Sequence, residues 1–299
     1  MKTLEELRRR IGSVEEMQSV VSTMKTLAAA RIRQFETAAE ATRAYSETVY
    51  QALQILMRNR EPTTARETQI DQASRIGCVL LGSDQGFCGR FNEVVSQAVV
   101  RFVENDTETG NSAQSPLMLT VGARLNQLML DSGFEIDRTI HVPKSVSDIT
   151  TVINDVTTRI EYWRSQYDVR RIELFFNLRT SAATYDVRQH QLMPLSRQFL
   201  NQLHTDKWES RCLPIHHLPW REQFTSVIGH YLFLALFRAC AESLASENAS
   251  RIAAMHQAEK NIDERLSGLN IQFNQNRQRA VTEELLDIMS GFEAVTSQD

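Results

Sequence analysis

The sequence contains few of the residues that break helices or cross-link a chain. Its 299 residues include six prolines, eleven glycines and four cysteines. No proline follows Pro219, so the last part of the chain lacks the strongest helix breaker. The cysteines are scattered without a paired metal-ligand spacing, which favours reduced, buried thiols in a cytosol over a disulfide framework. They are Cys78, Cys88, Cys212 and Cys240.

An excess of positive charge and a long apolar run are also missing. The formal net charge is −4, so the composition argues against nucleic acid or an anionic membrane as the main partner. The richest apolar stretch, residues 231–237, is too short to cross a bilayer. No apolar run follows the basic residues near the N-terminus. We therefore expect a soluble protein without a transmembrane segment, and its 42% hydrophobic content is enough for a real core.

Both ends of the chain carry the apolar repeat of a coiled coil. Near the N-terminus, apolar residues recur about every 3.5 positions. They are Leu7, Ile11, Val14, Met17, Val21, Met24, Ala28, Ile32, Phe35 and Ala39. A similar repeat near the C-terminus comprises Ala245, Ala249, Ile252, Met255, Ile262, Leu266, Leu269 and Phe273. Glu259 and Asn276 interrupt this second repeat, and such polar residues either fix the register of two helices or face a partner. We predict that the two end helices pair antiparallel.

Between the two repeats the pattern alternates between short apolar runs and helical segments. Strands are expected at 76–81, 117–121, near 140–142, at 171–178 and at 185–192, with helices at 92–104, 123–131 and 147–167. This alternation predicts a Rossmann-like α/β domain with a mostly parallel sheet and helices on both faces. The stretch 194–219, enriched in proline, histidine and tryptophan, is predicted to be irregular.

The complete prediction is an α/β protein with three parts. Residues 1–61 form an N-terminal coiled-coil helix that ends at Pro62, residues 62–219 form the central α/β domain, and residues 220–299 form the C-terminal coiled-coil helix.

A glycine-rich turn, Gly82 to Gly89, follows the first predicted strand and precedes a helix. A phosphate could bind at such a position. The turn lacks the lysine of a Walker A loop and the glycine spacing of a dinucleotide fingerprint, and Ser83 is not the central residue of a nucleophile elbow. We interpret it as a tight structural turn. Adjacent His216 and His217 do not converge on a metal without other ligands. We predict no catalytic residue, cofactor or metal site.

Charged and amide side chains at two places suggest contacts with another chain. Lys25, Arg31 and Arg33 flank the small residues 28–30, where a partner could approach closely, although a solvated helix face is the simpler interpretation. Residues 274–284 concentrate amide and guanidinium donors into about three helical turns. Arginine presents a rigid fork of donors, so this segment suits recognition of polar groups on another chain.

Three segments together resemble the gamma subunit of F-type ATP synthases, the central rotor stalk. The first, residues 24–33, combines a methionine, alanines and alternating basic residues. The second is the loop 83–92, with its Ser-Asp, Gly, Cys-Gly and Asn. The third is the block 246–255, followed by Asn274, Arg277, Gln278, Thr282, Glu283, Glu284, Ile288 and Gly291. The segments lie at the same ends of a chain of similar length, whereas the middle of the chain matches mainly by pattern.

The resemblance implies a rotor subunit without an active site of its own. Its coiled coil would enter the hexamer of alpha and beta subunits, while its α/β body binds epsilon and the membrane ring of c subunits. Carried over by motif, Arg277 and Gln278 would hydrogen-bond a loop of a beta subunit, and Met24 and Lys25 would lie near the same level. The full set of expected partner contacts is Met24, Lys25, Arg31, Arg33, Arg277, Gln278, Thr282 and Glu283.

The chain also departs from the family pattern. Arg90 and Phe91 stand where the family usually has glycine and leucine, and Lys25 and Thr26 stand where it often has another methionine. Residues 292–293, after Gly291, are not small. With the absence of a cysteine-bearing regulatory insert, these departures suggest a bacterial form of the sodium-translocating kind, on the cytoplasmic face of the inner membrane.

Two other classes of protein fit parts of the sequence. One is a soluble α/β ligand-binding protein or enzyme that dimerises through its terminal helices and binds its ligand at Gly82 to Gly89. The other is a nucleic-acid-binding coiled coil, which the acidic balance of charge disfavours.

Overall fold

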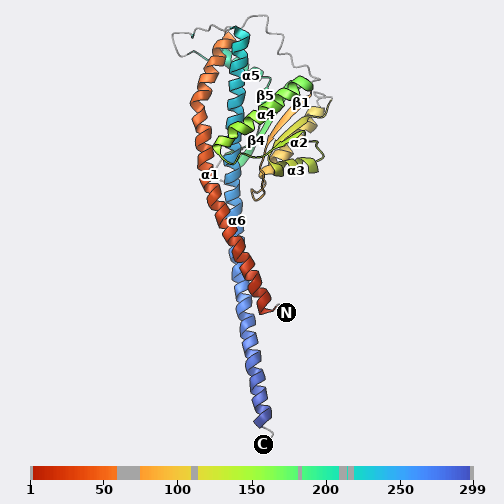
Figure 1. Cartoon of the computed structure of the whole chain (residues 1–299), viewed down its shortest axis with the longest axis vertical. Helices are drawn as coiled ribbons and strands as arrows, with labels where there is room; N and C mark the ends of the chain where they lie inside the picture. The colour runs from red at the N-terminus through yellow and green to blue at the C-terminus, as the bar shows by residue number, and fades with distance from the viewer. Residues whose placement is uncertain are drawn as a thin grey trace. The chain divides into compact units, whose positions relative to one another are not determined.

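The computed structural model describes residues 3–58, 75–108, 114–180, 184–208, 214 and 219–296. Pro62, Cys212, His216 and His217 lie outside this range. The chain divides into two compact units. The first consists of Met1–Leu27 with Ile252–Asp299, and the second is Ala28–Arg251. Helices α1 (Leu4–Arg58) and α6 (Trp220–Thr296), of 55 and 77 residues, each contribute to both units (Figure 1).

In the first unit, α1 and α6 pair antiparallel, as the apolar repeats predict. Gln18 Nε2 donates to Asp263 Oδ1 at 2.7 Å, and Lys25 Nζ pairs with Glu259 Oε2 at 2.6 Å. Leu7 and Met255 are buried. Glu259 therefore bonds to the opposite helix, which is one of the two roles expected of a polar residue in the repeat, and it fixes the register.

One position of the predicted N-terminal repeat is wrong. Met17 was expected on the face of α1 that packs against α6, but 59% of it is exposed. Gln18 is half-buried instead and bonds to Asp263. The step from Val14 is thus four residues rather than three, which an α-helix of 3.6 residues per turn permits as readily.

The second unit contains a five-stranded sheet in the order β3-β2-β1-β4-β5. Its strands are β1 (Ile76–Leu81), β2 (Leu117–Val121), β3 (Arg138–Ile140), β4 (Arg171–Arg179) and β5 (Tyr185–Met193). The pairs β1–β2, β1–β4 and β2–β3 are parallel, and β4–β5 is antiparallel. The chain leaves β1 in one direction and returns to β4 on its other side, so the strand order reverses at β1. This is the mostly parallel, Rossmann-like sheet predicted from the sequence.

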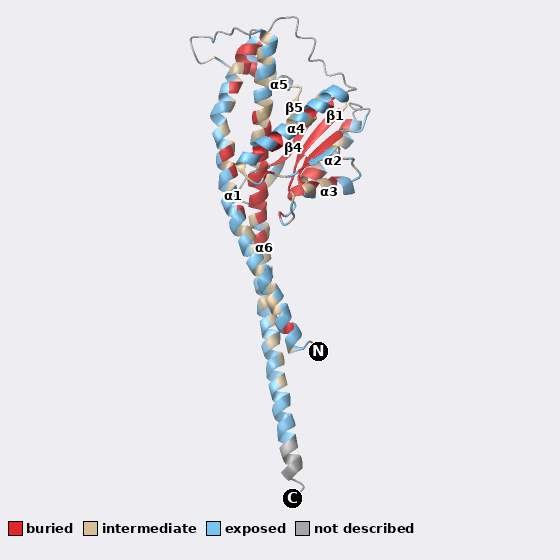
Figure 2. Ribbon diagram, viewed as in Figure 1, coloured by how far each residue is buried: buried red, intermediate tan, exposed pale blue. Residues whose placement is uncertain are grey.

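Both faces of the sheet are covered, which explains why β1 and β2 are buried along their whole length (Figure 2). Helices α2 (Phe91–Glu108) and α3 (Ala123–Asp131) pack on one face, through Val95, Val99 and Leu125 among others. The other face packs against α4 (Val146–Gln166) and the apolar stretch Leu236 to Ala245 of α6, with Phe35 of α1. The long helices are therefore built into the core of the α/β unit.

A short helix, α5 (Arg197–Thr205), lies in the stretch that we predicted to be irregular. The hydroxyl of Ser196 caps it by accepting a hydrogen bond from the backbone of Phe199. Leu203 of this helix is buried in a third apolar cluster with Leu53 of α1 and Leu234 of α6. The prolines at either end of the stretch led us to predict no helix, but tertiary packing stabilises one of nine residues.

Helix α6 contains an 18-residue window that is long and apolar enough to cross a membrane, judged by length and composition alone. The same test is passed by core helices of soluble proteins. Leu234, Leu236, Ala239 and Ala241 in its apolar part are buried against α1 and the sheet, and 28% of the window is buried.

Candidate functional site

The loop that follows β1 occupies the position where the strand order reverses. In open α/β sheets, ligands bind outside the carboxyl ends of the strands at this point. Gly82 begins the loop with a backbone N–H that donates to the carbonyl of Val121 at 2.8 Å. The carbonyl of Ser83 accepts from the backbone N–H of Arg124 at 2.9 Å. The loop is therefore held against the end of β2 and the start of α3.

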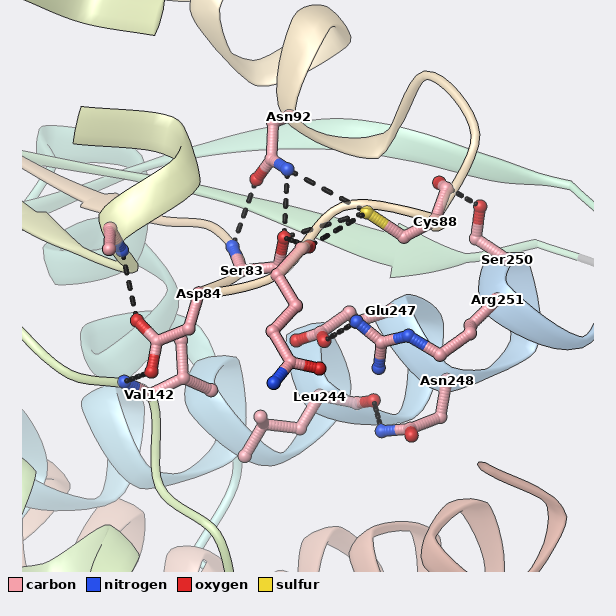
Figure 3. Close-up of polar contacts among 12 residues, drawn as sticks. Ser83, Asp84, Cys88, Asn92, Val142, Leu244, Glu247, Asn248, Ser250 and Arg251 are labelled. Carbon is pink, nitrogen blue, oxygen red and sulfur yellow. Dashed lines mark hydrogen bonds and ion pairs between the residues drawn. The ribbon is translucent and has the colours of Figure 1, made fainter. Parts of the chain in front are cut away.

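Asp84 joins the loops that follow three neighbouring strands. Its Oδ1 accepts from the backbone N–H of Ala123 at 2.9 Å, and its Oδ2 accepts from the backbone N–H of Val142 at 3.1 Å (Figure 3). The N-cap residue of α3 is Gly122, which has no side chain with which to cap the helix. The carboxylate of Asp84 supplies that cap from another loop, and its negative charge suits a helix N-terminus.

Ser83, Cys88 and Asn92 form a buried polar core inside the loop. Asn92 Oδ1 accepts from the Ser83 backbone N–H at 2.9 Å, and Asn92 Nδ2 donates to Ser83 Oγ at 2.8 Å. Ser83 Oγ donates in turn to the carbonyl of Gln85 at 2.7 Å. The Cys88 thiol lies 3.5 Å from Ser83 Oγ, and burial raises its pKa. These bonds hold the turn in one conformation, with Phe87 and Gly89 at positive φ.

Helix α6 packs directly against this loop. Ser250 Oγ donates to the carbonyl of Cys88 at 2.6 Å in a buried contact (Figure 3). A Cβ at Gly89 would lie 3.4 Å from Ser250 Oγ, which shows how closely the two backbones approach. The position where a doubly wound fold usually binds a ligand is thus occupied by the protein's own long helix.

A buried ion pair on α6 brackets Ser250, the residue that contacts Cys88. Arg251 Nη2 pairs with Glu247 Oε1 at 2.6 Å, and both side chains are at least nine-tenths buried. Burial raises the pKa of Glu247, and the neighbouring Asp84 raises it further, while Arg251 and Arg31 oppose the shift. Other buried polar residues on this part of α6 are Ser243, Ser246 and Asn248. The helix therefore changes from an apolar buried face to a polar buried face where it meets the loop.

The close packing of this loop makes Gly82 sensitive to substitution. An added Cβ would overlap Leu125 Cβ and lie 2.8 Å from Asn92 Oδ1. We expect Gly82→Ala to lower the free energy of unfolding by about 1–3 kcal/mol, the usual cost of overpacking. Gly86→Ala is the matched control because nothing lies within 4 Å of its Cβ position. Urea unfolding of both variants tests this, and equal stability of the two would contradict it.

The residues of the first unit that we expect to contact a partner differ in exposure and in whether they already bond within the chain. Arg277, Gln278, Thr282 and Glu283 are all exposed on α6. Met24 is half-buried, and Lys25 is engaged by Glu259 within the chain. The hydrogen bond from Lys25 lowers the pKa of Glu259. Their roles as partner contacts stay predictions. Arg31 and Arg33, on α1 in the second unit, are exposed.

The last turns of α6 extend beyond the start of α1. Continuing the antiparallel register from Gln18 and Lys25 places Leu4 level with about residue 278. Beyond this level, large apolar side chains are more than half exposed: Val281, Leu285, Leu286, Ile288 and Met289. A run of exposed apolar side chains on a helix marks an interaction surface.

Sequence reasoning found the loop but not what it contacts. The Gly82 to Gly89 turn was identified from its glycines, whereas the roles of Asp84 and Ser250 were not. Asp84 acts on backbone groups 39 and 58 residues away, and Ser250 on one 162 residues away. The only local signal for Ser250 is the density of polar residues at 246–251 within a repeat that is otherwise apolar.

The chain matches one protein family and curated proteins over nearly its whole length. The family model described as ATP synthase matches residues 3–295. The ATP synthase gamma chain of Geotalea uraniireducens (strain Rf4) is 27% identical, with 99% of each chain covered. That of Anaeromyxobacter dehalogenans (strain 2CP-C) is 28% identical, over 99% of this chain and all of the relative.

Solved structures share the fold. A chain in the rotor of the Euglena gracilis mitochondrial ATP synthase superposes with a TM-score of 0.60 at 18% identity, covering 93% of this chain and 98% of the other. A chain from the OSCP/F1/c-ring structure of the same enzyme gives 0.62 at 19% identity, with coverages of 98% and 94%.

Proposed function

This chain belongs to the ATP synthase family, and on that premise we propose that it is the gamma-type central stalk of a rotary F-type ATP synthase. It is a non-catalytic subunit. Its partners are the alpha and beta subunits of the catalytic hexamer, the epsilon subunit and the c-ring. It couples ion flow through the c-ring to conformational changes in the catalytic beta subunits.

The physical requirement for this coupling is a different set of contacts with each beta subunit. A ligand shifts a conformational equilibrium only through its differential affinity for the two states. A rotating shaft meets that requirement when its sides differ in chemistry. On the described part of α6, the guanidinium and amide groups of residues 274–279 are followed by a segment in which exposed apolar side chains such as Ile288 and Met289 are interspersed with acidic ones such as Glu283. The affinity of each beta subunit for this surface then depends on the rotational angle.

The observation that carries the proposal is the family match over residues 3–295 together with the antiparallel pairing of the chain's two ends. The main alternative was a ligand-binding protein or enzyme that dimerises through these helices. In this chain the apolar repeats pack on each other within one molecule, and the loop expected to hold the ligand packs against α6. Both features favour a stalk.

We propose that the exposed residues of α6 are the contacts with the beta subunits. Arg277 and Gln278 would hydrogen-bond a beta-subunit loop, with Thr282 and Glu283 one turn further along. All four are exposed and available to a partner. Met24 and Lys25 on α1 would contribute at the level of Glu259, which pairs with Lys25. The expectation that they lie level with Arg277 is wrong, because Arg277 is 18 residues, or about 27 Å, further along α6. Arg31 and Arg33 would face acidic side chains of the same hexamer.

Depletion and add-back of the chain test the function. A complex assembled without it should retain a slow ATPase of the alpha and beta subunits but pump no ions, and adding the full chain should restore pumping. The chain alone should hydrolyse no ATP. ATP hydrolysis by the purified chain, persisting after removal of trace alpha and beta subunits, would contradict the proposal, as would failure to restore pumping.

Three finer features are part of the proposal. The chain acts on the cytoplasmic face of a bacterial inner membrane, which protease access in inverted vesicles tests. Its departures at Arg90, Phe91 and Lys25 favour a sodium-translocating enzyme. ATP-driven uptake of radioactive sodium into vesicles that is insensitive to protonophores would support this, and uptake of protons alone would refute it. Its functional parts are the N-terminal coiled-coil helix, residues 1–61, the central α/β domain, residues 62–219, and the C-terminal coiled-coil helix, residues 220–299.

A further inference from the structure

Two kinds of contact hold α6 to the α/β sheet. Residues Leu236 to Ala245 pack on the sheet through apolar side chains. Apolar burial is strong but non-directional, so it turns the apolar face of a helix to the sheet without fixing the rotational setting as sharply as a directional bond does. Hydrogen bonds depend on direction and distance, and they do select one. The contacts between Ser250 and the loop are of this second kind.

The polar contact joins α6 to a rigid part of the sheet. Ser250 Oγ donates to the carbonyl of Cys88 at 2.6 Å, and the loop that presents this carbonyl is fixed internally by Asn92 and Ser83. Asp84 then ties the same loop to the loops after β2 and β3. A load on the helix at Ser250 is therefore shared by the ends of three strands.

Burying polar groups here costs free energy of folding, whereas burying apolar side chains at the same positions would not. The buried pair Glu247–Arg251 and the buried hydroxyls of Ser246 and Ser250 replace side chains that could have continued the apolar face. Apolar replacements of buried ion pairs are often neutral or stabilising, and buried polar groups are best known for fixing one register among several. The polar face thus fits a role in positioning.

We propose that the joint formed by the loop Ser83 to Asn92 and residues 246–251 of α6 fixes the rotational setting of the helix on the sheet, with Ser250 as the positioning residue. The joint makes helix and sheet turn as one body. Its mechanical role under load depends on the proposed rotor function, whereas its effect on the setting of the helix does not.

The first test measures the setting of the helix in the full chain. Spin labels are placed at the exposed positions Tyr162 of α4 and Thr225 of α6, in a Cys212→Ser background, and their distance distribution is recorded by pulsed EPR. We expect Ser250→Ala to raise the fraction of molecules outside the main distance peak about fivefold, since one hydrogen bond is lost. Ser250→Thr keeps the hydroxyl and should restore the single peak.

Ser246→Ala is the matched control. Ser246 is buried like Ser250 and lies on the same helix, but its hydroxyl donates to the carbonyl of Glu242 within α6 itself. A purely structural role predicts that both alanine variants behave alike, and this outcome would overturn the proposal. A positioning role predicts a broadened distribution only for Ser250→Ala.

The second test uses the assembled complex. Ser250→Ala should lower the number of ions pumped per ATP hydrolysed, and Ser246→Ala should leave this ratio unchanged. If the distance distribution broadens but the complex does not assemble with the chain, the proposed function fails while the joint stands. If the complex assembles and the distribution stays narrow in Ser250→Ala, the joint fails while the proposed function stands.

Discussion

Arg277→Ala is expected to lower coupled ATP synthesis by the assembled complex about tenfold or more, because the substitution would remove the charge-assisted hydrogen bond that we propose between Arg277 and a beta subunit. The Arg277 side chain is exposed on the described part of α6. Its removal should therefore leave the melting temperature of the isolated chain unchanged. Synthesis is measured in vesicles that carry the reconstituted complex and an imposed ion gradient.

The control for this prediction is Arg265→Ala, which removes an exposed arginine from the same helix. Its effect on synthesis should be small. Arg277 is not the contact that we propose if the two variants lose equal activity. The same conclusion follows if Arg277→Ala broadens the thermal transition of the chain, because the residue would then act on the fold.

Arg251→Met should lower the free energy of unfolding of the chain by about 3–5 kcal/mol at neutral pH, because it leaves the buried carboxylate of Glu247 without its partner. Arg238→Met is the matched control. It breaks a pair with Glu242 of the same four-residue spacing on the same helix, but the Arg238 side chain is 64% exposed. That loss should be at most about 1 kcal/mol, as for other surface pairs.

The destabilisation by Arg251→Met should depend on pH. Burial already raises the pKa of Glu247, and Arg251 opposes this shift, so the substitution raises the pKa further. A carboxyl group whose pKa is higher in the folded state binds more protons when folded, so stability falls as pH rises through that pKa. Acidification should therefore narrow the difference in melting temperature between Arg251→Met and the wild-type chain. A difference that stays constant or widens on acidification would show that Glu247 is not the cause.

The sequence predicted those parts of the fold that depend on local pattern. Apolar residues at helical spacing identified the paired faces of α1 and α6, and short apolar runs identified β1, β2 and β4, which are buried on both faces. The polar residue Glu259 could be interpreted in two ways from sequence. Its partner, Lys25, lies 234 residues away, so only the structure distinguishes a bond within the chain from a partner contact.

The candidate site was less predictable because its geometry arises from contacts between distant segments. The sequence identified the glycine-rich turn, but nothing near Asp84 indicates that its carboxylate caps α3. The stretch that contains α5 was wrongly predicted as irregular, since the apolar face of a helix of two to three turns is too short to stand out among prolines. The partner contacts proposed on α6 would involve a second chain, so their geometry is not encoded in this sequence alone.

The uninterrupted course of α6 has a consequence for how the chain tolerates changes in length. Each residue of an α-helix advances the side chains by about 100° around the axis. One residue inserted between Glu259 and Arg277 would leave the pair with Lys25 in place but turn Arg277 by more than a quarter of a circle. A seven-residue insertion would almost restore its direction. Evolution should therefore conserve the number of residues between Glu259 and Arg277 more strictly than the identity of each residue, because that number sets the direction in which Arg277 points.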